Sequence, residues 1–236
     1  MMDIKNAEVF GINRAINAIN NSFNVGEINT AIEPDEKKVK VARALGKNMD
    51  AHQSHDAYLK GILVTFDMKG NGVILPEIQR YHHFEIIMSQ SSQHSLDKFM
   101  TSKYDPFTKY VSEEVKNIAK KNYEAWKKVR DDYEKAQAVH ILSDEESMKW
   151  KIKIYHAMEI LMHNLPRGFE LWSTITTNYL QLKTIVIQRA NHKQQEDWCN
   201  FVEFCYSLPY FRELCGFTDK KWDLENIFPL AMKLKD

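Results

Sequence analysis

The chain has 236 residues, and its 32 basic and 32 acidic side chains give a formal net charge of zero. This balance argues against a basic nucleic-acid-binding protein, which would carry an excess of cations. With 44% apolar residues the chain can form a core, and its length predicts a single domain over residues 1–236, or one domain with a helical extension. No run approaches the roughly 20 apolar residues of a membrane helix.

Other features of composition indicate where the protein works. The first residues, MMDIKNAEVF, lack the long apolar stretch of a signal peptide. The three cysteines, Cys199, Cys205 and Cys215, show no paired spacing, which argues against a disulfide framework. We therefore expect a cytoplasmic protein that does not engage a membrane.

The N-terminal third alternates apolar runs with turn-forming residues. Gly11 ends the first run, and Pro34 with the following acids is typical of a first helical turn. The expected elements are a strand at residues 7–12, a helix at 13–23, a helix at 35–59, a strand at 61–68 and a turn at 69–72.

The remaining two thirds are mainly helical by pattern. Ser112 precedes two acids, and Ser143 with Glu146 forms a capping-box pattern, so both serines mark helix starts. The expected helices lie within residues 73–93 through Ile78 and Phe84, and at 112–137, 143–162, 169–190 and 192–207. These elements predict an α+β fold with a small mixed or antiparallel sheet packed with long helices.

Residues 165–196 carry an ordered set of landmarks. These are Leu165-Pro166, a threonine-rich approach at 174–177, Asn178, Arg189, and the element His192-Lys193-Gln194-Gln195-Glu196. Their order resembles that of the flavin-dependent thymidylate synthases. Weaker matches reach the strand at 7–12 and the region of His55, so the resemblance implies the fold of that family for the whole chain.

Asn178 and Arg189 are the two landmarks with the clearest chemistry. They are eleven residues apart, about three helical turns, and so share a helix face. An arginine there can make bidentate hydrogen bonds to a uracil edge or a phosphate. The residues alone leave open an ion-paired surface arginine for Arg189 and an N-cap for Asn178. The resemblance implies that Arg189 holds dUMP and that Asn178 helps to hold FAD.

Residues 79–94 match the family signature only in part. The signature reads Arg-His-Arg, two residues, Ser, one residue, Asn-Glu, one residue, Ser, one residue, Arg. This chain keeps Arg80, two histidines and several serines, but the Asn-Glu pair and the closing arginine are absent. Met162 and Leu180 also stand where the family has arginines. The tract Ser89-x-Ser91-x-x-His94 is similar to that of a divergent phage and mobile-element branch.

The resemblance implies a set of site residues. They are Ser89 and Ser91 for catalysis, Arg189, Arg80, Gln93 and His94 for the nucleotide, and His55, His82, His83, Asn178 and His192 for the flavin. The implied cofactor is FAD, with NADPH and methylenetetrahydrofolate where the family reaction is retained. The implied partners are a dUMP-like nucleotide and other copies of the chain in a homotetramer.

Two functions from different classes follow. The first is reductive C5 methylation of dUMP or a related pyrimidine nucleotide. The second is a non-catalytic oligomeric phage or mobile-element protein that binds a nucleotide or a host protein. The lost arginines motivate the second, because a charge-assisted hydrogen bond contributes roughly 1.5–3 kcal/mol.

Two other patterns do not favour a site. His52-x-x-His55 has no accompanying glutamate or cysteine, so we expect no metal site. Ser91 and His94 could form a nucleophile and base, but no third group or nucleophile elbow accompanies them.

Overall fold

The computed structural model describes residues 2–47, 49 and 55–235, and the chain divides into two compact units. The first unit comprises Met1–Gly70, Ile74–Ser89 and Trp172–Asp236, and the second comprises Asn71–Val73 and Gln90–Leu171. Each unit has a hydrophobic core made only of its own residues. The single domain expected over residues 1–236 stays a prediction.

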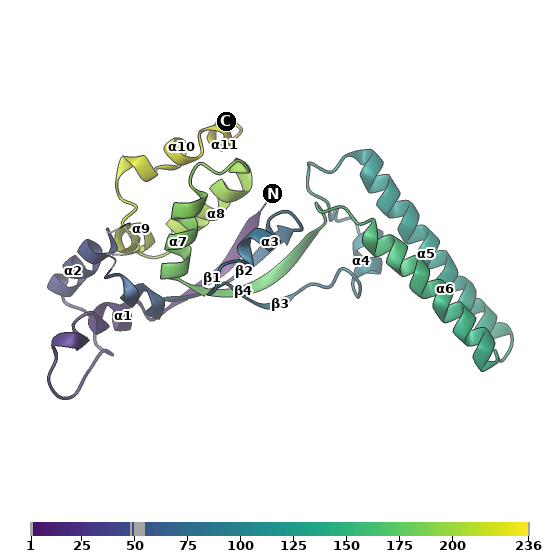
Figure 1. Cartoon of the computed structure of the whole chain (residues 1–236), viewed down its shortest axis with the longest axis horizontal. Helices are drawn as coiled ribbons and strands as arrows, with labels where there is room; N and C mark the ends of the chain where they lie inside the picture. The colour runs from purple at the N-terminus through teal and green to yellow at the C-terminus, as the bar shows by residue number, and fades with distance from the viewer. Residues whose placement is uncertain (1, 48, 50–54, 236) are drawn as a thin grey trace. The chain divides into compact units, whose positions relative to one another are not determined.

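The first unit is built on a four-stranded sheet in the order β1-β2-β4-β3 (Figure 1). The strands are β1 (Asp3–Phe10), β2 (Leu63–Asn71), β3 (Glu85–Ser89) and β4 (Glu170–Asn178). The pairs β1–β2 and β3–β4 are antiparallel. Tyr179 N–H donates to the Ile62 carbonyl at 3.0 Å and Thr174 donates to Asp67 at 2.8 Å, so β2 and β4 also run in opposite directions.

Helices complete the first unit. The α-helices are α1 (Ile12–Ala18), α2 (Glu36–Gly46), α3 (Leu75–Ile78), α7 (Tyr179–Arg189), α8 (Gln195–Ser207), α9 (Phe211–Cys215), α10 (Leu224–Ile227) and α11 (Pro229–Lys233). The 3-10 turns are η1 (Asn21–Phe23), η2 (Ala57–Gly61) and η3 (Lys220–Trp222).

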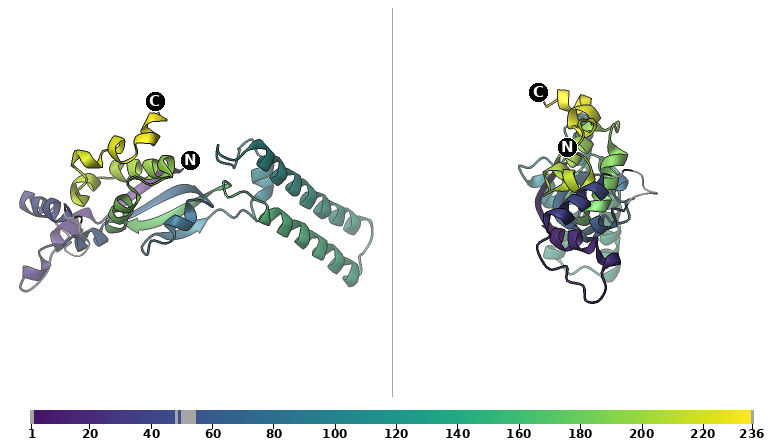
Figure 2. Two further views of the ribbon diagram at one scale, coloured as in Figure 1. Left: turned by 45° about the horizontal axis from the view of Figure 1, so that its top comes forward. Right: turned by 90° about the vertical axis from the view of Figure 1, so that its left-hand side faces the viewer.

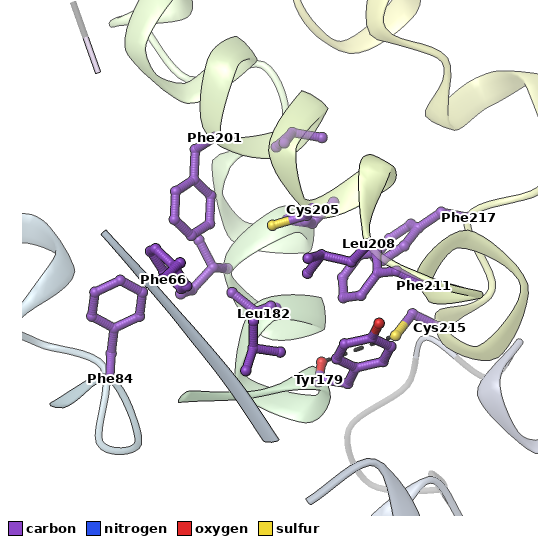
Figure 3. Packing of buried hydrophobic residues seen from close by; sticks show 14 of the residues in the cluster. Phe66, Phe84, Tyr179, Leu182, Phe201, Cys205, Leu208, Phe211, Cys215 and Phe217 are labelled. Carbon is purple, nitrogen blue, oxygen red and sulfur yellow. Dashed lines mark hydrogen bonds between the residues drawn. The ribbon is translucent and has the colours of Figure 1, made fainter. Parts of the chain in front are cut away.

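The core of the first unit lies between the sheet and helices α7 and α8. Every second residue of β2 is buried, as a strand with one covered face requires. Phe66 on β2 packs edge-on against Phe84 at 5.9 Å between ring centroids. Figure 3 shows these rings facing Leu182 of α7 and Phe201 of α8. Helix α7 is thereby held by its inner face.

The second unit is dominated by a helical hairpin. Helices α5 (Glu113–Val139) and α6 (Asp144–His163) lie side by side, and α4 (Leu96–Thr101) precedes them (Figure 2). Tyr123 and Trp126 of α5 pack with Leu96 and Leu161, in agreement with the apolar spacing of that helix. The capping box at Ser143 is confirmed, with Ser143 Oγ accepting from the Glu146 N–H at 3.3 Å.

Two strands, β3 and β4, lie in ranges where the sequence predicts helices. Residues 169–190 form β4 and then α7, with the change at Asn178. Residues 73–93 contain only the short α3 and then β3. In both places β-branched residues pair with a neighbouring strand that lies far away in sequence, and this pairing decides the conformation.

Three local expectations are also wrong. The helix expected over 35–59 ends at Gly46, and residues 57–61 form η2. Pro34 lies before that helix, because Asp35 is its N-cap and accepts from the Lys38 N–H at 2.8 Å. The turn expected at 69–72 begins later, because β2 continues to Asn71 and Lys69 pairs with Asp3.

Two remaining observations concern the chain as a whole. Within the described ranges, no helix is long and apolar enough to cross a bilayer. Cys199, Cys205 and Cys215 are free and buried, and burial raises the pKa of each thiol. Inert thiols of this kind agree with the absence of a disulfide framework.

Candidate functional site

Helix α7 begins and ends at the two landmark residues. Asn178 is its N-cap, and Asn178 Oδ1 accepts from the Gln181 N–H at 2.9 Å. Arg189 is its last residue, because Ala190 leaves the helical conformation with ψ 131° and Asn191 follows in a left-handed conformation with φ 61°. The segment from Glu77 to His83 contacts α7 near both ends. The candidate site is therefore α7 together with this segment.

Arg189 is held by the segment that follows α3. Its Nη1 donates to Glu77 Oε2 at 2.9 Å, and its Nε donates to the Tyr81 hydroxyl at 2.9 Å. A longer contact of 3.5 Å joins Nη2 to the Glu77 carbonyl. Arg189 therefore forms an ion pair with Glu77, as one of its two alternatives stated. A ligand that binds Arg189 has to do so beside this ion pair.

Aromatic rings enclose the same guanidinium. Its carbon lies 4.4 Å from the Trp198 ring centroid and 5.5 Å from that of Tyr81. Trp198 is fully buried, so the stack is shielded from water and the cation–π contact is strengthened. Burial raises the pKa of Tyr81, although Arg189 partly opposes it, so the hydroxyl is neutral near pH 7.

His192 joins this group from the turn after α7. Its Nδ1 accepts from the Gln194 N–H at 3.2 Å, which assigns the proton of the neutral ring to Nε2. Nε2 lies 3.7 Å from Glu77 Oε2. Glu77 therefore faces two potential cations, Arg189 and His192, at the C-terminal end of α7.

The other end of α7 carries the histidine pair. His82 and His83 are exposed, and their ring centroids lie 4.6 Å apart. The His83 carbonyl accepts from Thr177 Oγ1 at 2.7 Å, and its N–H donates to Gln181 Oε1 at 3.3 Å. The His82-His83 turn is thus hydrogen-bonded to the residues on either side of Asn178, Thr177 and Gln181, and its flavin role stays a prediction.

Arg80 and His55 are exposed. Arg80 lies in the turn between Glu77 and the histidine pair, and it has no ion pair among the residues that the structure describes. His55 lies just before η2 and next to the buried Asp56. No contact in the described part of the chain joins His55 to α7, so its flavin role stays a prediction.

The remaining expected residues lie near the boundary of the two units. Ser89 is the last residue of β3, is exposed, and pairs with Ser173 of β4. Ser91, Gln93 and His94 belong to the second unit, in the turn before α4. Ser91 Oγ accepts from the His94 N–H at 3.1 Å, which is a local turn contact and not the pairing of a nucleophile with a base.

No metal centre is found in the part of the chain that the structure describes, where no three His, Cys, Asp or Glu side chains are suitably grouped. His52 lies outside the described residues. The pattern predicted that His52 and His55 lie on one helix. His55 lies outside any helix, so this prediction is wrong for His55.

Comparison with known proteins supports the fold alone. No family model matches the chain, and no curated protein matches it. Thymidylate synthase X from Helicobacter pylori, crystallised with FAD and dUMP, is similar at TM-score 0.54 and 14% identity, covering 91% of this chain and 97% of that chain. A UMP/dUMP methylase from Streptomyces cacaoi, bound with 5-Br dUMP, is similar at TM-score 0.53 and 11% identity, with 92% and 94% covered.

The chain has the fold of the flavin-dependent thymidylate synthases. A second Helicobacter pylori structure with this name, complexed with FAD and dUMP, covers 90% of the chain at TM-score 0.54 and 13% identity. The expected α+β class with an antiparallel sheet and long helices is confirmed.

Within this thymidylate synthase fold, sequence reasoning missed the residues that hold Arg189. Glu77 and Tyr81 lie more than 100 residues before it, and Trp198 lies on the next helix. No motif links them to Arg189. The only local signal is the four-residue spacing of Glu77 and Tyr81 after Pro76, which is typical of two side chains on one face of a short helix.

Proposed function

We propose that this protein binds a dUMP-like pyrimidine nucleotide and FAD as a divergent flavin-dependent thymidylate synthase-like protein. One observation carries the proposal. In a fold shared with dUMP-binding and FAD-binding proteins, the segment 77–83 lies along α7 and gathers nucleotide and flavin candidates on one helix. The reaction that fits is reductive C5 methylation of dUMP or a related pyrimidine nucleotide.

The donor set at the histidine turn fits a flavin dinucleotide. A pyrophosphate needs cations or N–H donors, and exposed Arg80, His82 and His83 supply them within four residues. Asn178 would contribute its amide N–H₂, since its oxygen caps α7. When bound, FAD would carry the hydride, with NADPH as its reductant and methylenetetrahydrofolate as the carbon donor.

The pyrimidine would be held at the other end of α7. We assign it to Arg189, with the Tyr81 and Trp198 rings that lie against its guanidinium excluding water, and His192 keeps the flavin role that the resemblance implies. The roles of Ser89, Ser91, Gln93 and His94 stay predictions of the family resemblance. The described residues would therefore orient the nucleotide and shield it, while the cofactors supply the chemistry.

A non-catalytic protein is the second candidate. It is favoured by the contact of Arg189 with Glu77, which already neutralises one of the few remaining arginines. Such a protein would retain the fold, assemble as an oligomer and bind a nucleotide or a host protein. The serine–histidine tract at 89–94 suggests a phage or mobile-element origin, and we place either form in the cytoplasm.

The test combines a flavin spectrum with nucleotide binding by the Arg189→Ala variant. We expect purified protein to carry FAD absorbance and to gain thermal stability with dUMP. Arg189→Ala should weaken dUMP binding roughly 10- to 100-fold, because a charge-assisted hydrogen bond is lost.

Arg43→Ala is the matched control, since Arg43 is exposed on α2 and lies outside the candidate site formed by α7 and residues 77–83. It should leave dUMP binding unchanged. Colourless protein that takes up no FAD and shows no dUMP-dependent shift would exclude the enzyme and leave the non-catalytic candidate.

A further inference from the structure

Arg189 already has an internal anion. Glu77 Oε2 lies 2.9 Å from its Nη1, so the positive charge of the guanidinium is balanced before any ligand binds. The side chains of Arg189 and Glu77 are only 15% and 25% exposed, which weakens the screening of this pair by water. The pair is therefore a fixed electrostatic element of the site.

The guanidinium is also held in one orientation. The Tyr81 hydroxyl accepts from its Nε, and the rings of Tyr81 and Trp198 lie against it. Guanidinium has five N–H donors, and contacts within the described residues use three, one on each nitrogen. Two N–H donors, both on the Nη atoms, remain beyond these three contacts, and we take them as the donors that a ligand would use.

The charge on Glu77 determines which ligand group can use these donors. An anionic group at Arg189 would also lie close to the Glu77 carboxylate, and like charges at such distances repel. A neutral carbonyl oxygen accepts the same hydrogen bonds without that repulsion. His192 Nε2, 3.7 Å from Glu77, adds compensating charge only when protonated.

We propose that Glu77 is a positioning and selectivity residue, which makes Arg189 accept a neutral carbonyl edge, such as that of a pyrimidine, and reject an anionic group. This inference rests on the proposed function, in which the pyrimidine nucleotide contacts Arg189. Under it, the phosphate of the nucleotide is bound away from Arg189.

The experiment compares wild type with Glu77→Gln using two probes, inorganic phosphate and deoxyuridine. Glutamine keeps the size of the side chain and can still accept from Arg189. We expect Glu77→Gln to bind phosphate at least about tenfold more tightly than wild type, because the repulsion is removed. Deoxyuridine affinity should change less than about threefold, because a neutral acceptor does not experience that repulsion.

Three further variants make the result specific. Glu77→Gln combined with Arg189→Gln should lose the gain in phosphate binding, and Glu77→Asp, which keeps the charge, should not show it. Glu203→Gln removes an exposed carboxylate paired with Lys235 and should behave as wild type. Equal phosphate affinity in wild type and Glu77→Gln, or a gain that survives the loss of Arg189, would overturn the role of Glu77.

The two probes separate this inference from the proposed function. Failure of wild type and Glu77→Gln to bind deoxyuridine or dUMP would refute nucleotide binding at α7. The phosphate measurement would still decide whether Glu77 excludes anions from Arg189. A large, equal loss of affinity for both probes in Glu77→Gln would show a purely structural role and contradict the selectivity.

Discussion

Lys183 is a charged residue on the inner face of α7. Its Nζ lies 2.6 Å from Asp56 Oδ2 and 3.0 Å from the Gly46 carbonyl, and the side chains of Lys183 and Asp56 are only 3% and 5% exposed. A buried ion pair adds little net stability over an apolar pair, but leaving one partner alone is very unfavourable. The pair therefore fixes the chain around Asp56 and Gly46 to the helix that carries the candidate site.

We expect Asp56→Asn to lower the free energy of unfolding by about 3–5 kcal/mol, because it removes the carboxylate that lies 2.6 Å from the buried Lys183 ammonium. Urea unfolding measures the change. Glu145→Gln is the control, since it breaks the exposed pair with Lys149 and should cost less than about 1 kcal/mol. Equal effects of the two substitutions would mean that the buried pair is not important for stability.

At the scale of elements, α2 and α9 pack at unusually close range where α2 ends. A Cβ built on Gly46 would lie 1.7 Å from the Leu214 carbonyl oxygen, a distance that no side chain can occupy. The Tyr58 hydroxyl lies between the same elements, 2.8 Å from the Ala42 carbonyl and 3.0 Å from the Leu214 carbonyl, and its single proton is shared between these two acceptors. The glycine is required by packing and not by its backbone angles.

Gly46→Ala should therefore destabilise the protein, by roughly 1–3 kcal/mol from overpacking. This sign is the reverse of the usual one, because alanine in place of a helical glycine is normally favourable by about 1 kcal/mol. Thermal unfolding of Gly46→Ala beside Ala44→Gly, an exposed position of the same helix, checks it. A Gly46→Ala protein that is more stable than wild type would contradict the close approach of α2 and α9.

At the scale of the whole molecule, the exposed apolar residues of α6 favour self-association. Met148, Ile152 and Tyr155 recur at helical spacing and are 50–62% exposed. Contiguous apolar surface of this kind commonly marks a protein–protein contact. The homotetramer stays a prediction, and we expect this face of α6 to form one of its contacts.

We expect light scattering to give four times the 27.7 kDa mass of one chain. Ile152→Lys should reduce that mass, because it would bury a charge in the contact. Glu124→Lys, exposed on α5, should leave the mass unchanged. A wild-type mass of one chain would exclude the tetramer, and an unchanged mass for Ile152→Lys would place the contact elsewhere.

The sequence predicts local structure correctly where a residue interacts with residues close to it in the chain. Ser143 with Glu146 marked the start of α6, and Ser112 with the acids after it marked the start of α5. Residues 170–178 were misread as helix because their apolar spacing suits either structure. Only pairing with β2 and β3, distant in sequence, makes them a strand.

The sequence by itself determined the α+β class and the starts of the two long helices α5 and α6 at Ser112 and Ser143. Only the tertiary structure decided what surrounds Arg189. Glu77 lies 112 residues before Arg189, and no local pattern connects them. Folding brings the carboxylate to the guanidinium and so sets the charge of the site, because electrostatic contacts depend on distance in space and not along the chain.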